Sequence, residues 1–208
     1  RTLNPYGRYL DERYDRIGLE HLIGKEDVGA KIPFEIWRNG KQESVEVVIR
    51  NIKASDMLVP YYEYDKRPEY LVLGGFVFQK LTRDYMTMWG EGWQGKVPPH
   101  LYQYYRQYAF RPTDDRSDIV LLSYVLPTEM NLGYQQLGRL VVKSFNNKEI
   151  KKFQDILDAL LLTPESPFHV VEFELDSPTV VIPKALMDQT DQQITQLYGI
   201  PQLAYFEN

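Results

Sequence analysis

The hydrophobic pattern between residues 118 and 183 changes its period several times, and these changes limit the fold more than any other feature of the chain. Short apolar or alternating runs predict strands at 118–126, 137–145, 168–175 and 179–183. Asn146 and Asn147 predict a turn after the second of these strands. Residues 149–162 then carry apolar side chains at the i, i+3, i+4, i+7 spacing of an amphipathic helix. This order of elements predicts an α+β fold.

The segments that flank this core pattern are less regular. Residues 70–81 (YLVLGGFVFQKL) are rich in β-branched and aromatic side chains, and the pair Gly74-Gly75 inside such a run predicts a bulge or a close backbone approach. Residues 82–117 form an aromatic-rich insertion in which we expect one or two short helices. A terminal helix is predicted at 187–198, because a glycine follows it at once and a proline soon after.

An Asn-Gly pair marks the N-terminal part of the chain. Residues 31–37 and 43–50 resemble strands joined through Asn39 and Gly40, which is the strongest short-range signal for a hairpin. A short helix is predicted at 16–24, and the apolar face of the hairpin finds no partner within this segment. We therefore expect residues 1–50 to be the C-terminal part of a first domain and residues 51–69 to be a linker. Residues 70–208 would form a second domain, with an insertion at 82–117.

Composition excludes several classes of function. The net charge is -5 over 208 residues, whereas nucleic-acid affinity depends on Lys and Arg that neutralise phosphates, so nucleic acid is not an expected partner. No window approaches the roughly 18 apolar residues that a membrane helix needs, so membrane insertion is not expected. The absence of cysteine excludes disulfides, thiolate metal sites and a cysteine nucleophile. The chain opens at Arg1 rather than Met, which suggests a fragment of a longer protein.

The polar residues do not assemble a catalytic or metal-binding motif in the sequence. The three histidines are scattered, and none lies near a nucleophile motif: His21, His100 and His169. The tight acidic group lacks the glycine and the terminal glutamate of a calcium loop, which favours a solvated turn: Asp114, Asp115 and Asp118. We therefore expect no catalytic residue, no metal and no cofactor. The aromatic insertion, which lacks a basic stripe, is expected to pack within the chain or against a neighbouring subunit.

Residues 120–160 carry a resemblance to a known family. An apolar strand ends in Val125-Leu126-Pro127, and the segment 137–147 (LGRLVVKSFNN) is similar to the pattern G-D-x-I-x-x-V-N-G of bacterial PDZ domains. This chain has Arg139 where that pattern has Asp, and Asn147 where it has Gly. The chain as a whole resembles the region that follows the protease domain in Do-like (HtrA-type) serine proteases, and residues 17–50 resemble the end of a first PDZ domain.

The resemblance implies a PDZ-like, partly open β-barrel or sandwich with flanking helices, and a groove between a strand and a helix in which a partner's extended tail adds as a strand. It implies a carboxylate-binding loop at Gly74, Gly75 and Phe76. The strand edge would be formed by Phe76, Val77 and Phe78, and the helix wall by Phe153, Leu157 and Leu160. The adjacent glycines depart from the family loop, which spaces them around an apolar residue. The helix residues could instead be ordinary core residues.

The implied function is that of a non-catalytic, peptide-binding and regulatory segment, which positions substrates or controls the assembly of an attached protease. The implied partners are polypeptide segments or C-terminal tails, the protein's own protease domain, and further copies of the chain in a homo-oligomer. The alternative is a structural scaffold for oligomers, in which the chain's own insertion fills the groove. A bacterial relative would work in the periplasm or cell envelope, but no residue pattern here selects a compartment.

Overall fold

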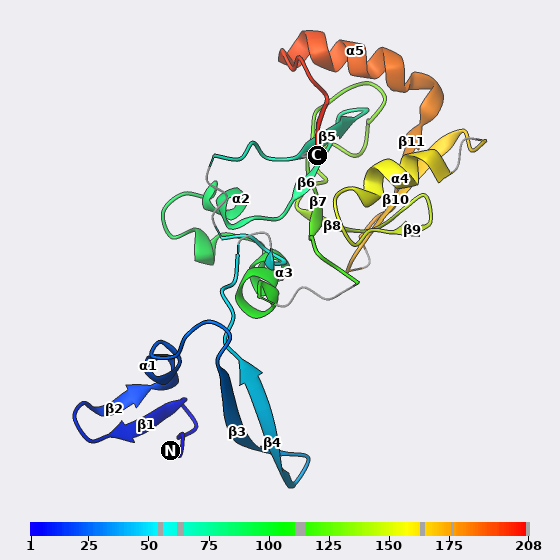
Figure 1. Ribbon diagram of the computed structural model, residues 1–208. Helices are drawn as coiled ribbons and strands as arrows, with labels where there is room; N and C mark the ends of the chain where they lie inside the picture. Colours follow the sequence, from blue (N-terminus) through cyan, green and yellow to red (C-terminus); the bar gives the residue numbers. More distant parts are fainter. Residues whose placement is uncertain (54–55, 62–64, 111–114, 163–164, 176, 207–208) are drawn as a thin grey trace. The chain divides into compact units, whose positions relative to one another are not determined.

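A computed structural model describes residues 1–53, 56–61, 65–110, 115–162, 165–175 and 177–206. The chain splits into two compact units, Arg1–Ile52 and Lys53–Asn208, which are described separately (Figure 1). Residues 54–55 and 62–64 of the predicted linker and Asp114 of the predicted acidic turn lie outside the described residues.

The first unit consists of two small hairpins and one short helix. Its elements are β1 (Arg8–Asp11), β2 (Asp15–Gly18), α1 (Leu19–Ile23), β3 (Lys31–Arg38) and β4 (Lys41–Val48). The helix predicted at 16–24 begins later than expected, because Asp15–Gly18 pairs with Arg8–Asp11 as an antiparallel strand. Among residues 1–52, all of which the structure describes, Tyr9 is the one buried hydrophobic side chain.

The predicted Asn-Gly hairpin is confirmed in this unit. β3 and β4 pair antiparallel over eight residues each, from Lys31 opposite Val48 to Arg38 opposite Lys41. Asn39 and Gly40 have φ of 51° and 75°, the left-handed values that a two-residue hairpin turn needs.

The second unit is built on one antiparallel sheet with the strand order β11-β10-β8-β7-β6-β5-β12, and β9 pairs with β8 beside this path. The described strands form an open sheet with β11 and β12 at its two ends, so they do not close into a barrel. The architecture is thus α+β with antiparallel sheets. The strands are β5 (Tyr70–Leu73), β6 (Phe76–Lys80), β7 (Val120–Val125), β8 (Leu140–Phe145), β9 (Lys148–Glu149), β10 (Phe168–Phe173), β11 (Val180–Pro183) and β12 (Ala204–Tyr205).

Helices in the second unit are short, except at the C-terminal end. They are α2 (Arg83–Thr87), η2 (Trp93–Gly95), α3 (Pro99–Gln103), η3 (Tyr104–Tyr108), α4 (Asp155–Leu162), η4 (Lys184–Leu186) and α5 (Met187–Tyr198). α5 has the predicted bounds, and Gly199 caps it with a φ of 63°. The helix predicted at 149–162 begins only at Asp155, because Lys148–Glu149 pairs with β8 as β9.

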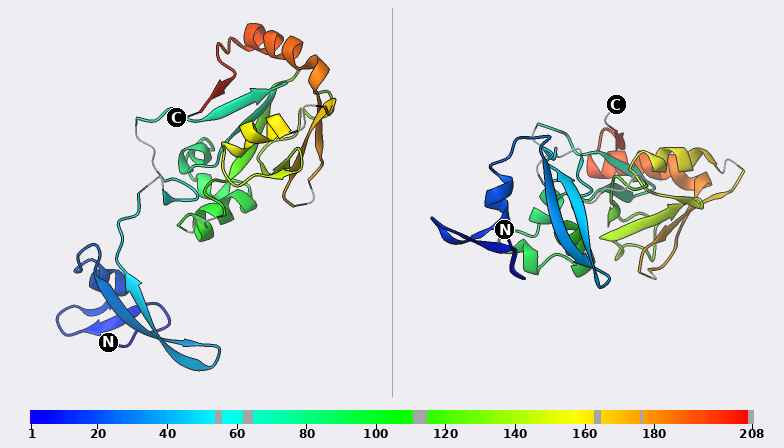
Figure 2. Two further views of the ribbon diagram at one scale, coloured as in Figure 1. Left: turned by 45° about the vertical axis from the view of Figure 1, so that its right-hand side comes forward. Right: turned by 60° about the horizontal axis from the view of Figure 1, so that its bottom comes forward.

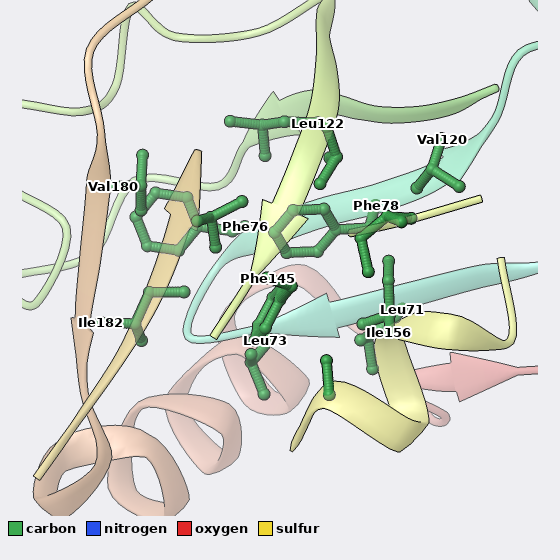
Figure 3. Packing of buried hydrophobic residues seen from close by; sticks show 14 of the residues in the cluster. Leu71, Leu73, Phe76, Phe78, Val120, Leu122, Phe145, Ile156, Val180 and Ile182 are labelled. Atoms are coloured by element: carbon green, nitrogen blue, oxygen red, sulfur yellow. The ribbon is translucent and has the colours of Figure 1, made fainter. Parts of the chain in front are cut away.

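The sheet is buried on both faces. Alternate residues of β7 point to opposite sides, so Leu122 packs against α4 while Leu121 packs against α2 and α3. Figure 3 shows the first of these cores, with Leu71 and Leu73 of β5 and Ile156 of α4 facing a common interior. The aromatic insertion supplies the second core, where Trp93 and Leu101 are buried. Packing within the chain is therefore one role of the insertion.

Candidate functional site

Gly74 and Gly75 form the tight turn between β5 and β6. Their φ values of 56° and 88° lie in the left-handed region, where residues with a Cβ are strained. A Cβ on Gly75 would lie 2.5 Å from the carbonyl oxygen of Leu126, and one on Gly74 would collide with Met130. The predicted close backbone approach is therefore confirmed, but in a hairpin turn rather than in a bulge.

Three backbone polar groups of this turn are hydrogen-bonded within the chain. The Gly74 amide donates a hydrogen bond to Oδ1 of Asp191 on α5 (2.9 Å), and its carbonyl accepts one from Nδ2 of Asn131 (3.1 Å). The Gly75 carbonyl accepts from the Leu126 amide (2.7 Å). Burial raises the pKa of Asp191, whereas the bond from Gly74 opposes this rise. The loop that the resemblance assigns to carboxylate binding thus already binds a side-chain carboxylate.

Phe76, Val77 and Phe78 lie in β6, which is an interior strand. β6 pairs with β5 on one side and with β7 on the other, so its backbone has no open edge. Phe76 and Phe78 are buried in the core between the sheet and α4. From the sequence we expected β6 to form the edge of the groove. In the structure β5 lies beside β6 on the side away from β7, so that position belongs to β5.

The outer edge of β5 pairs with a short segment from the C-terminal part of the chain (Figure 2). Ala204 lies opposite Leu71, and Tyr205 lies opposite Tyr70, in antiparallel register. The Val72 amide donates a hydrogen bond of 2.6 Å to the carbonyl oxygen of Leu203. We call residues 202–206 the tail segment. It adds a strand to a sheet edge, which is how many domains bind extended peptides.

The helix wall predicted from the resemblance comes close to the same segment. Phe153 is buried just before α4, and its ring stacks on that of Phe206 with centroids 4.9 Å apart and an interplanar angle of 26°. Leu157 and Leu160, within α4, are half-buried, and Leu160 packs against the core. The tail segment thus contacts the edge of β5 through its backbone and the region before α4 through Phe206.

A polar contact holds the start of the tail segment. The guanidinium of Arg67 donates to the Tyr70 hydroxyl (3.0 Å) and to Oε1 of Gln202 (3.3 Å). Its carbon lies 4.7 Å from the ring centroid of Tyr205, within cation–π range. The Tyr70 hydroxyl donates to the Gln202 carbonyl (2.7 Å). Sequence reasoning missed these residues, although the apolar run Leu203 to Phe206 after a proline was a usable signal.

The histidines occupy separate places, and the contacts described for them are structural. Nε2 of His100 lies 2.9 Å from the Arg139 carbonyl oxygen, and Nδ1 of His169 lies 2.8 Å from Nδ2 of Asn146. His21 lies on α1 in the first unit. None of the described helices combines the length and the apolar character that a membrane crossing requires.

Comparisons with known proteins give one family and several distant relatives. A sequence model of the PDZ domain family matches residues 59–204. The chain is 27% identical over 187 residues to Protease Do-like 2, chloroplastic, of Arabidopsis thaliana, an alignment that covers 90% of this chain and 29% of that protein. It is 25% identical over 163 residues to the Serine protease DegP homolog of Plasmodium falciparum (isolate 3D7), which covers 78% of this chain and 17% of that protein.

A third relative is Putative protease Do-like 3, mitochondrial, of Arabidopsis thaliana, with 24% identity over 169 residues. That alignment covers 80% of this chain and 27% of the relative. The similarity to Do-like serine proteases is thus distant but extends over most of the chain. The chain spans less than a third of the length of these relatives.

Proposed function

The chain belongs to the PDZ domain family, and from this premise we propose that it is a non-catalytic, peptide-binding and regulatory region of a Do-like serine protease. In this proposal residues 70–208 are a second PDZ-like domain, a partly open barrel with the insertion 82–117. Residues 1–50 are the end of a first PDZ-like domain, and 51–69 link the two. The names of the relatives support the protease context.

One observation carries the peptide-binding part of the proposal: the edge of β5 accepts an antiparallel strand. The Val72 amide points outward and donates to a carbonyl of that strand, while the ring of Phe153 lies within reach of its side chains. Strand addition supplies affinity through main-chain hydrogen bonds and specificity through alternate side chains. The proposed site is therefore the edge of β5 with the helix wall, rather than β6.

In a longer protease this site would position unfolded polypeptide segments or C-terminal tails near the catalytic domain. It could equally control assembly, with the protein's own protease domain and further copies of the chain as partners. These roles rest on the family and on the names of the relatives, because the present chain covers the PDZ region alone.

A second candidate function is a structural scaffold for oligomers with an occluded groove. It is favoured by the tail segment on β5 and by the Asp191 carboxylate at Gly74. The segment on the edge is 202–206 and not the insertion 82–117, which packs on the opposite face of the sheet.

The two functions are separated by a pair of matched proline substitutions. Val72→Pro removes the outward amide of β5, and Val181→Pro removes an outward amide of β11 at the other end of the sheet, where it donates to the Tyr134 hydroxyl (3.4 Å). Proline is tolerated best on edge strands, where its missing N–H faces away from the neighbouring strand, although its ring also restricts φ. Fluorescence anisotropy with labelled, unstructured apolar peptides measures the affinity.

We expect Val72→Pro to weaken peptide binding by about tenfold or more, since at least one main-chain bond and its alignment are lost. Val181→Pro should bind as the unmodified chain does, and both variants should melt cooperatively. Equal affinity in the two variants would contradict the proposed site. A chain that binds no peptide but forms a defined oligomer in sedimentation experiments would favour the scaffold.

A further inference from the structure

Arg139 lies directly before β8, at the position where the PDZ pattern has an aspartate. Its φ of 61° is left-handed, and its carbonyl oxygen lies 2.9 Å from Nε2 of His100 on α3. A Cβ on the preceding Gly138 would lie 2.9 Å from the carbonyl oxygen of Ser123, so the backbone here runs close against β7. The backbone of Arg139 is therefore held by its neighbours, while its side chain is exposed.

The side chain of Arg139 lies over an aromatic residue of the insertion. Its guanidinium carbon is 5.8 Å from the ring centroid of Trp89, within cation–π range. The rings of Tyr85 and Trp89 meet edge to face, with centroids 5.5 Å apart. Burial raises the pKa of Tyr85, and the positive charge of Arg139 opposes this rise, so the guanidinium also acts on the Tyr85 hydroxyl. The contacts described for Arg139 include no carboxylate.

These side chains line a pocket of about 350 Å³, which we call the Arg139 pocket. Of the described residues that line it, Arg139 alone carries a charge. Met88 is 77% exposed and Tyr124 is 56% exposed, so the rim presents apolar surface to solvent. Tyr85 and Trp89 pack against the core on the insertion side of the sheet. The residues that line the pocket besides Arg139 are Gln79, Tyr85, Met88, Trp89, Ser123 and Tyr124.

A single cation beside apolar and aromatic side chains suits a carboxylate with an apolar neighbour. The planar guanidinium donates two parallel hydrogen bonds to a carboxylate. Aromatic residues, methionine and arginine are also the residue types that are enriched in protein interfaces. Nucleic acids and other polyanions are bound by several cations together, which one arginine on a chain with a net charge of -5 does not supply. The chemistry of the pocket therefore favours an acidic polypeptide.

We propose that the Arg139 pocket binds an acidic segment of a partner protein, in which a carboxylate pairs with Arg139 and a neighbouring apolar side chain packs on Met88, Trp89 and Tyr124. An aspartate at position 139, which the PDZ pattern has, would repel the same ligand. This site does not depend on the one proposed at β5, because the pocket lies on the insertion side of the sheet, whereas the tail segment packs on the α4 side.

The test measures the binding of two labelled peptides with blocked ends by fluorescence anisotropy. The acidic peptide is GSDFEFDSG, and the amide peptide GSNFQFNSG replaces each carboxylate by the matching amide. Arg139→Gln removes the charge of the pocket, and Arg106→Gln makes the same change at an exposed side chain elsewhere on the insertion. Met88→Ser removes apolar surface at the rim, and its control is Leu197→Ser, at a side chain of α5 that is 71% exposed.

We expect Arg139→Gln to weaken binding of the acidic peptide about tenfold and to remove most of its salt dependence, because the charge-assisted hydrogen bonds are lost. Met88→Ser should weaken it about threefold, since less apolar surface is buried. Both control variants should bind like the unmodified chain, and so should Val72→Pro, which disables the β5 edge. In NMR titrations the indole N–H signal of Trp89 should shift, whereas that of Trp37 in the first unit should not.

Equal affinity of Arg139→Gln and Arg106→Gln for the acidic peptide would overturn the proposal. Equal binding of the acidic and the amide peptide by the unmodified chain, or binding of neither, would overturn it as well. If Val72→Pro alone lost the acidic peptide, that peptide would bind at the β5 edge, which contradicts the Arg139 pocket and supports the function proposed above. Thermal melting checks that each variant is folded. If Arg139→Gln melts early, the comparison of Met88→Ser with Leu197→Ser decides, because both side chains are largely exposed.

Discussion

At the scale of single residues, Asn146 and His169 form a buried polar pair next to α4. Asn146 has a φ of 49°, and its side chain donates to the Ala159 carbonyl (2.9 Å) and accepts from the Val170 amide (3.0 Å). Its Nδ2 also faces Nδ1 of His169 at 2.8 Å, a contact that suits a neutral ring accepting at Nδ1. The turn, α4 and β10 are thus connected through one asparagine, which the sequence indicated only as a turn residue.

The neutral state of His169 makes stability depend on pH. Burial, aided by the charge of Lys184, lowers the pKa of His169 from 6.5 to about 4. Between pH 6.5 and about pH 4, His169 is protonated in the unfolded chain but neutral in the folded chain. The free energy of unfolding therefore falls as the pH decreases through this range. Thermal melting across this range should show the decline, and His169→Gln should reduce it.

The control for this effect is His100→Gln, because His100 contacts a backbone carbonyl and is only partly buried. That variant should keep the full decline in melting temperature. If His169→Gln and the unmodified chain lose stability equally between pH 6.5 and 4, carboxylates rather than His169 are responsible.

At the scale of elements, the sequence predicts those that have a clear local period. The β3–β4 hairpin, β7, β8, β10, β11 and α5 are predicted close to their observed bounds, because alternation, helical spacing and capping residues act within a few positions. The β5–β6 hairpin was missed because residues 70–81 form one nearly continuous apolar run, in which Gly74-Gly75 predicted a bulge or a close backbone approach. β12 has two residues and no local period, so only tertiary contact creates it.

The candidate site follows the same division. The helical spacing predicts α4 and, with it, Leu157, Leu160 and the preceding Phe153. The identity of the edge strand depends instead on the order of strands in the sheet, which a local pattern does not contain. For this reason the sequence indicates Phe76–Phe78 in β6, whereas β5, one hairpin turn away, pairs on its outer side with the two-residue β12.

Two neighbouring residues of α4 distinguish the core from the proposed peptide site. Ile156 is fully buried, while Leu157 is half-buried and faces a different direction on the helix. Ile156→Glu places an unpaired charge in the core and should cost about 3 kcal/mol or more, enough to unfold the second unit. Leu157→Glu should cost about 1 kcal/mol and weaken peptide binding about tenfold.

Thermal melting with and without peptide measures both effects. The result that contradicts a site at Leu157 is a variant that melts normally and binds peptide like the unmodified chain. A Leu157→Glu chain that unfolds together with Ile156→Glu would show that both side chains belong to the core.

At the scale of the whole molecule, the two units differ in how they are stabilised. The second unit has two hydrophobic clusters, one on each face of its sheet. The first unit, which is described throughout, has the single buried hydrophobic residue Tyr9 and exposes Trp37 and Val47. Burial of apolar surface is the main favourable term in folding. The free energy of unfolding should therefore be larger for the second unit than for the first.

Hydrogen exchange of the intact chain measures this difference. Amides of β6, β7 and β8 lie in the middle of the sheet and should exchange about 100-fold or more slowly than those of β3 and β4. The β3–β4 ladder is the internal control, because it has as regular a register as the large sheet but lacks its burial. Equal protection in both units would show that one cooperative core includes residues 1–52.

The turn at Gly74 and Gly75 also has a consequence for how such chains can vary through evolution. Both positions have a left-handed backbone, but at Gly75 a Cβ would also meet the backbone oxygen of Leu126, whereas at Gly74 it would meet only the end of the flexible Met130 side chain. Gly90 has a similar φ of 76° but open space around it, so a side chain there meets only the backbone strain. Selection for folding alone should therefore hold residue 75 more constant than residue 90 among related chains.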